Sequence, residues 1–294
     1  MSNTTKPVNQ KAWFLVLPVI LCVAFSAVLP LMTVVNYSVQ DIFSPERRVF
    51  VGTEWFAAVM RDEELHLALW RQIQFSLAVL LVEIPLGIAL ALSMPAQGWK
   101  SSAVLVLVAL SLLIPWNVVG TIWQIFGRAD IGLLGYFLQW AGMEYSYTGN
   151  SSHAWWTVLA MDVWHWTPLV ALLAFAGLRS IPDAYYQAAS IDGASRWAVF
   201  RYIQLPKMRQ VLIIAILLRF IDSFMIYTEP FVLTGGGPGF SSDLPAKFVV
   251  DHILNRQELG LGAAGAFVLL CTVIAVISPY IHFELRKARD GGGH

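Results

Sequence analysis

The chain has 294 residues, of which 57% are hydrophobic and only 13% charged, and its formal net charge at pH 7 is zero. Soluble domains carry about 25% charged residues, so the composition excludes an ordinary soluble protein. The balanced charge argues against a nucleic-acid partner. Cys22 and Cys271 both lie in apolar runs, which excludes a disulfide framework and a cysteine-based metal motif.

Six apolar runs are long enough to cross a bilayer, because a transmembrane helix needs about 20 apolar residues. The chain is therefore predicted to be an all-α membrane protein with six transmembrane helices, which form one domain over residues 12–284. In chain order the runs cover residues 12–35, 70–94, 102–126, 154–178, 211–233 and 260–283.

The distribution of Lys and Arg predicts the orientation of the chain. These residues are concentrated in the segments that share a side with the N-terminus, although the segments on the other side are longer. Cytoplasmic segments of membrane proteins carry such an excess, so residues 1–11 and 285–294 are predicted to be cytoplasmic termini. Residues 179–210 then form a cytoplasmic loop.

This loop has the pattern of two short helices. Pro182 suits the first turn of a helix, and Gly193 favours a helix end because glycine accepts the left-handed conformation. A second short helix is predicted over residues 195–203. Pro206 is predicted to break the chain before the fifth span.

The same loop carries a specific sequence motif. In order, it contains Gln187-Ala188-Ala189, Asp192-Gly193-Ala194, Phe200, Ile203 and Leu205-Pro206. This pattern resembles the permease subunits of binding-protein-dependent ABC importers, which usually have Glu where this chain has Gln187. The resemblance implies a type I ABC importer permease fold, in which the loop is a coupling helix that docks on a cytoplasmic ATPase.

The resemblance also implies the partners and the location. The chain is expected to work with two cytoplasmic ATPase subunits, a second homologous permease and a periplasmic solute-binding protein, in the lipid bilayer of a bacterial inner membrane. ATP and Mg²⁺ would be bound by the ATPases, so no cofactor is expected in this chain. The glycine-rich run 235–239 is not followed by the Lys-Ser or Lys-Thr of a phosphate-binding loop, and it is interpreted as a turn.

Three further segments narrow the resemblance. Residues 231–239 look like the carbohydrate-uptake branch of the family, and residues 162–166 and 222–230 are similar to glycerol-uptake permeases of proteobacteria. The expected solute is accordingly glycerol, another polyol or a sugar.

Polar residues inside the spans are candidates for the substrate path, because ionisable groups there usually face a cavity or each other. Asp162, Trp164 and His165 lie together on the fourth span. Asp222 lies three residues from Arg219 on the fifth span, where the pair is interpreted either as a structural ion pair or as part of the substrate site. Glu83 is interpreted as structural.

Two other groups complete the candidate path. Asn117 and Thr121 form one helical stripe with Gln124, which could serve helix packing or substrate contact. Tyr227 and Glu229 lie near the outer end of the fifth span, where Glu229 is expected to be hydrated. No group of cations suited to phosphate accompanies them, so a neutral hydroxylated solute is expected.

Two other classes of function are weighed against an importer subunit. A proton-coupled secondary transporter would use Asp162, His165 and Asp222 as a relay, but it would leave the motif of the loop without a role. An intramembrane enzyme would need a nucleophile–base pair or a metal cluster, and no such arrangement is found in the sequence.

Overall fold

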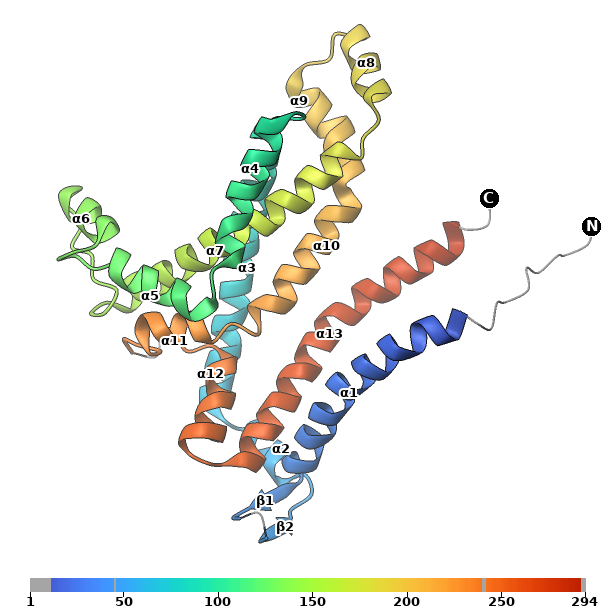
Figure 1. Cartoon of the computed structure of the whole chain (residues 1–294). Helices are drawn as coiled ribbons and strands as arrows, with labels where there is room; N and C mark the ends of the chain where they lie inside the picture. The colour runs from blue at the N-terminus through green and yellow to red at the C-terminus, as the bar shows by residue number, and fades with distance from the viewer. Residues whose placement is uncertain (1–11, 45, 240–241, 292–294) are drawn as a thin grey trace, which may run out of the picture. The chain divides into compact units, whose positions relative to one another are not determined.

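The computed structural model describes residues 12–44, 46–239 and 242–291, and the predicted cytoplasmic segment 1–11 lies outside them. The described residues are mostly helical (Figure 1). They fall into two compact units, which are taken separately below. One holds the chain up to Asp62 together with Val249–Thr272, and the other holds Glu63–Phe248 and the chain from Val273.

The first unit consists of a long apolar helix and a small hairpin. Its α1 helix is exposed on every side, as expected for a helix whose solvent is lipid. The indole N–H of Trp55 donates a hydrogen bond to the carbonyl of Gln40 at 3.0 Å, and Phe56 packs edge-on against Phe267. The elements are α1 (Ala12–Ser38), β1 (Gln40–Ile42), β2 (Arg48–Phe50), α2 (Glu54–Val59), the π-helical turn η3 (Asp251–Asn255) and the start of α13 (Leu259–Gly291).

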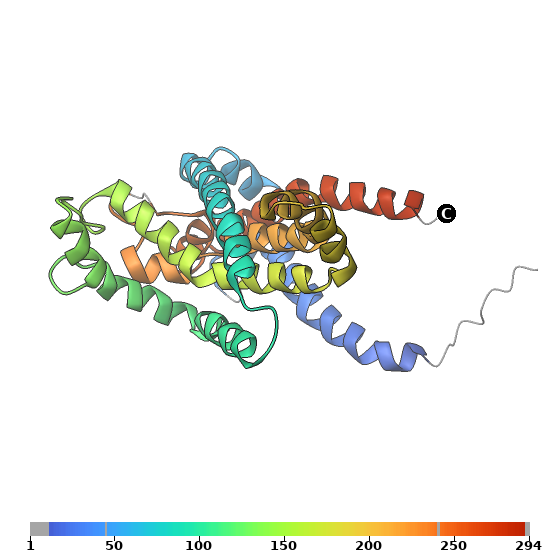
Figure 2. The same ribbon diagram turned by 90° about the horizontal axis from the view of Figure 1, so that it is seen from above.

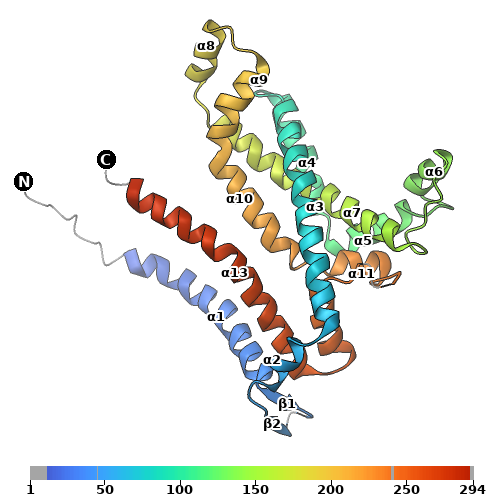
Figure 3. The same cartoon turned by 180° about the vertical axis from the view of Figure 1, so that it is seen from behind.

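The second unit is organised around three mutually contacting helices, α3 (Glu63–Ser93), α7 (Ser151–Arg179) and α10 (Leu205–Ser223). Figures 2 and 3 show α3 crossing α7. Their close approach depends on Gly87 of α3, because a Cβ at this position would lie 2.5 Å from Val170 Cγ1.

Two hydrophobic clusters lie along these helices. The first joins α3, α7, α11 and α5 around Phe75, Trp123 and Met161. The second joins α3, α7 and α10 around Ala91, Phe175 and Met208. The remaining elements of the unit are α4 (Trp99–Ala109), η1 (Leu110–Leu113), α5 (Trp116–Phe126), α6 (Leu133–Trp140), α8 (Asp183–Ile191), α9 (Arg196–Val199), η2 (Phe200–Gln204), α11 (Thr228–Thr234) and α12 (Pro245–Val250).

The third predicted span is sharply bent. The segments Trp99–Leu113 and Trp116–Phe126 meet at 93°, so the span predicted over 102–126 is not one continuous helix (Figure 1). The cause is Pro115, which forces Ile114 into an extended conformation with ψ of 125°. A helix cannot continue through such a residue, and α5 starts in a new direction.

The fifth predicted span is also bent, at a different place from the one expected. Arg196–Ser223 runs without a break and meets Thr228–Thr234 at 52°. Pro206 therefore does not interrupt the helix. A proline ring clashes with the carbonyl four residues earlier, and here that residue lies in the wider π-helical turn η2, which relieves the clash.

With these bends, the described residues contain four unbroken helices that could cross a membrane, and two bent pairs that bring the number to six. The six predicted runs coincide with these elements in position and order. The fold class predicted from the sequence is confirmed, with the correction that two of the spans are broken.

Candidate functional site

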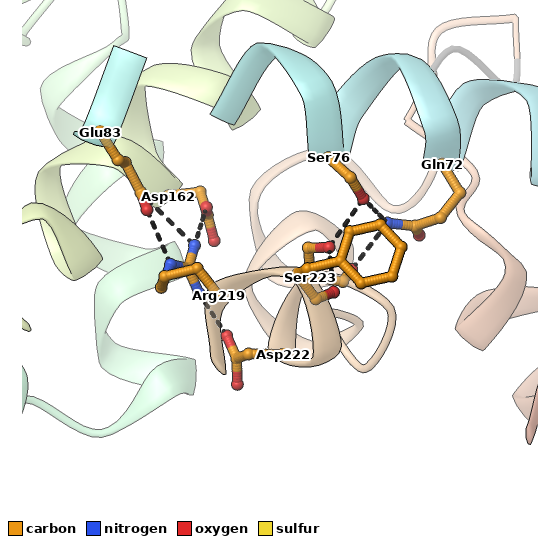
Figure 4. Close-up of polar contacts among 8 residues, drawn as sticks. Gln72, Ser76, Glu83, Asp162, Arg219, Asp222 and Ser223 are labelled. Carbon is orange, nitrogen blue, oxygen red and sulfur yellow. Dashed lines mark hydrogen bonds and ion pairs between the residues drawn. The ribbon is translucent and has the colours of Figure 1, made fainter. Parts of the chain in front are cut away.

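A buried arginine forms the polar centre of the second unit (Figure 4). The Arg219 guanidinium on α10 donates to both oxygens of Glu83 on α3, at 2.7 and 3.0 Å. It also donates to Asp162 on α7 at 2.6 Å and to Asp222, one turn further along α10, at 2.5 Å. The three helices are thus tied together by one side chain.

The burial of these groups differs, and the difference separates their roles. The side chains of Arg219 and Glu83 have no exposed surface, and that of Asp162 is 2% exposed, whereas that of Asp222 is 32% exposed. A buried charge needs a close partner, so Glu83 and Asp162 hold the arginine. Asp222 is the one of the three carboxylates that also faces open space.

The surroundings of the cluster exclude water from its inner part. Along α3, Glu83 lies between Val79 of the first hydrophobic cluster and Ala91 of the second. The indole ring of Trp166 lies 4.8 Å from the guanidinium carbon of Arg219 and covers one of its faces. The arginine is therefore held by carboxylates at its edge and by an aromatic ring on its face.

The structure shows whether Arg219 and Asp222 form the ion pair that their spacing allows. Arg219 and Asp222 do form an ion pair, and Glu83 has the structural partner that was expected of it. Asp162 and His165 lie on one buried face of α7, but the Nδ1 atom of His165 is buried without a hydrogen-bond partner. The imidazole instead packs edge-on against Trp166, at 5.1 Å between ring centres.

A second buried polar group joins α3 to α10, and it was not foreseen (Figure 4). The Gln72 amide donates to the Ser76 hydroxyl at 2.9 Å and to the carbonyl of Ser223 at 2.8 Å, and the two serine hydroxyls are 2.7 Å apart. The spacing of Gln72 and Ser76, four residues apart in an apolar run, was the signal that could have found it.

The predicted stripe on α5 is present and faces outward. Asn117, Thr121 and Gln124 are all exposed, and the Thr121 hydroxyl donates to the carbonyl of Asn117 at 3.0 Å. Trp164 of α7 is 41% exposed and meets the buried Trp123 of α5 edge-on. These groups offer hydrogen-bonding and aromatic surface that the packing of the unit leaves free.

The last two candidates lie beyond the bend of the fifth span. The ring of Tyr227 stacks on Phe231 at 5.2 Å. Glu229 is only 6% exposed, so the expectation that it is hydrated is wrong. The bend turns α11 against α5, where the backbone of Glu229 comes within reach of Gly120, and this packing covers the side chain.

The loop between α7 and α10 has the two-helix form that the sequence predicted. Helix α8 ends at Ile191 and is followed by Gly193, whose φ of +65° suits glycine, and the Ala194 amide donates back to the carbonyl of Ala189 at 2.9 Å. The hydroxyl of Ser195 caps α9 by accepting from the Ala198 amide. The second helix does not stop near residue 203 but continues through η2 into α10.

The residues of the motif divide by exposure. Gln187, Ala188, Asp192 and Pro206 are exposed. Ala189, by contrast, lies on the buried side of α8. Phe200 and Leu205 are half-buried; Phe200 packs against Trp197 at 5.5 Å, and Leu205 packs on the second hydrophobic cluster. Helix α8, which carries the exposed Gln187 and Ala188, lies at one end of the unit (Figure 1).

Among the residues that the structure describes, no group of three His, Cys, Asp or Glu side chains could hold a metal ion. The three carboxylates around Arg219 already share its guanidinium. The polar centre is therefore an ion-pair cluster that ties helices together.

The family model for the inner membrane component of binding-protein-dependent transport systems matches residues 83–287. The trehalose/maltose transport system permease protein MalF of Thermococcus litoralis is 31% identical, with 92% of each chain covered. The sulfoquinovosyl glycerol transport system permease protein SmoG of Agrobacterium fabrum is 28% identical over 81% of this chain and 78% of its own length.

Solved structures agree in fold. A chain of a bacterial ABC transporter for the import of the acidic polysaccharide alginate superposes with a TM-score of 0.78 at 19% identity, with 94% of this chain and 95% of the other covered. Because the family model matches residues 83–287 and a relative is 31% identical over 92% of each chain, the chain belongs to the family of binding-protein-dependent transport system inner membrane components, as a permease subunit of an ABC importer and not an enzyme.

Proposed function

We propose that this chain imports a neutral, hydroxylated solute of the carbohydrate class by alternating access, with glycerol or another polyol as the first candidate and a sugar as the second. Two cytoplasmic ATPases would drive it through the loop 179–210. A second homologous permease would complete the path, and a periplasmic binding protein would deliver the solute. Both termini would be cytoplasmic.

The names of the relatives support the carbohydrate class. The relatives named above transport trehalose or maltose and sulfoquinovosyl glycerol, and a third relative, 25% identical, is the diacetylchitobiose uptake system permease protein DasB of Streptomyces coelicolor. Each of these solutes presents several hydroxyl groups on a carbon frame. A glycerol moiety occurs in one of them, which is compatible with a polyol.

The chemistry of the exposed polar groups also supports a neutral solute. Arg219 is the buried cation nearest to the candidate path, and its charge is taken up by carboxylates. The open side of Asp222 can accept hydrogen bonds from hydroxyls, and Trp164 offers a ring for a C–H face. Asn117 and Thr121 add amide and hydroxyl groups on α5.

The observation that carries the coupling part of the proposal is the exposed surface of α8. Ala188 projects only a methyl group from it, so the backbone of the helix can approach a partner closely there. Gln187 can donate and accept hydrogen bonds but cannot form the ion pair that a glutamate would form.

The runner-up, a proton-coupled transporter, has less support. Its relay would need Asp162, His165 and Asp222 to exchange protons in sequence. Asp162 and Asp222 both accept hydrogen bonds from Arg219, and His165 Nδ1 has no hydrogen-bond partner. The Nδ1 atom of His165 is therefore not hydrogen-bonded to either carboxylate, as a relay through it would require.

The test is uptake into proteoliposomes that contain the chain with its permease, ATPase and binding-protein partners. We expect accumulation of labelled glycerol to require ATP, to be unaffected by a collapse of the pH gradient, and to be displaced by unlabelled glycerol. Maltose and trehalose serve as competitors that test the alternative solute.

Two outcomes would change the hypothesis. Competition by a sugar but not by glycerol would retain the importer and replace the solute. Uptake that follows a pH gradient without ATP would overturn the importer in favour of the secondary transporter. A liposome with the ATPase subunits omitted is the control for passive leakage.

A further inference from the structure

The connections of the coupling helix α8 to the rest of the second unit are uneven. Towards α7, the chain passes through three residues outside regular helix, Ser180, Ile181 and Pro182. A cavity of about 570 Å³ lies between the N-terminal end of α8 and the ends of α3 and α7. Its lining includes Met94, Phe175 and Arg179. The cavity also reaches Tyr186 of α8 and Gln204, so α8 is not closely packed against the ends of α3 and α7.

Towards α10, by contrast, α8 is held by two adjacent tyrosines. The ammonium group of Lys207 donates to the Tyr185 hydroxyl at 3.0 Å and lies 4.4 Å from the centre of its ring. The Gln204 amide donates to the Tyr186 hydroxyl at 3.4 Å. Both bonds run from the first turn of α8 to residues 204–207, where η2 passes into α10.

The segment that receives these bonds leads without a break to the buried cluster. Arg196–Ser223 is one continuous helix, and Arg219 lies near its far end. A helix is stiff along its axis, so a displacement at residues 204–207 moves Arg219 and Asp222 as well. The hydrogen bond from Lys207 and its positive charge also lower the pKa of the Tyr185 hydroxyl, because both stabilise the phenolate form.

We propose that Tyr185 and Tyr186 are positioning residues that clasp the coupling helix to the start of α10. A displacement of α8 by a docked ATPase is then passed to α10, and through it to the helices that Arg219 ties together. The inference rests on the proposed function, because it takes α8 as the surface on which the ATPase docks. It adds the route of the force and the side chains that transmit it.

The experiment uses the reconstituted complex with its ATPase, permease and binding-protein partners, and measures solute imported per ATP hydrolysed. Tyr185→Phe keeps the ring and removes the hydroxyl, Lys207→Met removes the charge, and Tyr186→Phe removes the second bond. Exposed ion pairs and cation–π contacts are weak, so each broken pair is expected to lower the ratio by about twofold to fivefold. The combination of Tyr186→Phe and Lys207→Met is expected to have the largest effect.

Two matched controls come from the same segment. Tyr202 and Arg209 are exposed on η2 and α10, and Tyr202→Phe and Arg209→Met are expected to leave the ratio at the wild-type value. Ala188→Trp serves as a docking control, because a large side chain on the exposed face of α8 should weaken the binding of the ATPase itself.

A chemical cross-link that replaces the hydrogen bond between Tyr186 and Gln204 tests directly whether α8 and α10 move together. Cysteines at positions 186 and 204, in a background where Cys22 and Cys271 are serines, can be joined by a short bis-maleimide. If α8 and α10 move as one body, the cross-linked complex transports at the rate of the same protein before cross-linking. Arrest of transport by the cross-link would overturn the inference.

The remaining outcomes are distinct. If the clasp variants import as much solute per ATP as the wild type, the inference is overturned and the proposed function stands. The same holds if the clasp variants lose ATPase binding, as Ala188→Trp is expected to do. If the wild-type complex shows no ATP-driven uptake, the proposed function falls and the inference falls with it.

Discussion

At the scale of single residues, the exposed fraction of each side chain decides what the four members of the ion-pair cluster do. Glu83 and Arg219 are sealed between two hydrophobic clusters, whereas a third of the Asp222 side chain is open. A carboxylate with no access to water depends entirely on its arginine, and one with access can be hydrated instead. The cluster therefore has a structural inner side and an adaptable outer side.

This difference predicts a graded response to substitution. Arg219→Met would leave buried carboxylates without a cation and is expected to cost about 3–5 kcal/mol of stability. Glu83→Gln is expected to cost about 1–3 kcal/mol, because the amide leaves buried donors of the guanidinium poorly satisfied. Asp222→Asn is expected to cost less than either, since water reaches that carboxylate.

The measurement is thermal unfolding of the purified protein in detergent, followed by circular dichroism at one fixed pH. Arg209→Met, which removes an exposed cation from the same helix, is the control and should change the midpoint little. A loss at Asp222→Asn equal to that at Glu83→Gln would contradict the division into inner and outer sides.

At the scale of helices, the crossing of α3 and α7 depends on the absence of a side chain at Gly87. A methyl group at this position would lie 2.5 Å from Val170 Cγ1 and 2.7 Å from its Cβ, with Val170 fully buried. Neither helix backbone can move away without disturbing Glu83 and Asp162, which lie on the same two helices. The glycine thus sets the separation at which the arginine can reach both carboxylates.

Gly87→Ala is accordingly expected to destabilise the protein by about 1–3 kcal/mol through overpacking. Val170→Ala removes Cγ1, the atom nearest to the new methyl group, but keeps Cβ, so the loss in the double variant is expected to be smaller than the sum of the two single losses. Thermal unfolding of the two single variants and the double variant forms a complete cycle. Additive losses would show that the two positions do not meet and would refute the packing argument.

At the scale of the whole molecule, the arrangement of charge predicts the sidedness that transport requires. The loop 179–210 carries a dense group of cations, and the positive-inside rule places it in the cytoplasm with both termini. The same orientation places Thr148, between the third and fourth spans, on the outer side.

Cysteine labelling checks this topology. In a background without Cys22 and Cys271, Thr148→Cys is expected to react with a membrane-impermeant maleimide in intact spheroplasts, whereas Ser190→Cys on α8 is expected to react only in inside-out vesicles. Both positions are exposed, so access to the protein surface is matched between them. The reverse pattern of labelling would refute the orientation.

The sequence by itself determined the class of the fold, the positions of the six spans and the motif of the loop 179–210. These properties depend on local features: the length of an apolar run sets a span, and the left-handed preference of Gly193 sets a helix end. Composition and spacing therefore sufficed for them, and the family comparison confirmed the permease that the motif of the loop predicted.

Only the tertiary structure decided which polar groups meet. Arg219 is 136 residues from Glu83 and 57 from Asp162 in the chain, and helical spacing links it only to Asp222. It also decided that Glu229 is covered, because the bend that places α11 on α5 depends on packing between distant segments. Contacts between helices depend on crossing angles and close approach, and no periodicity within one helix encodes its neighbour.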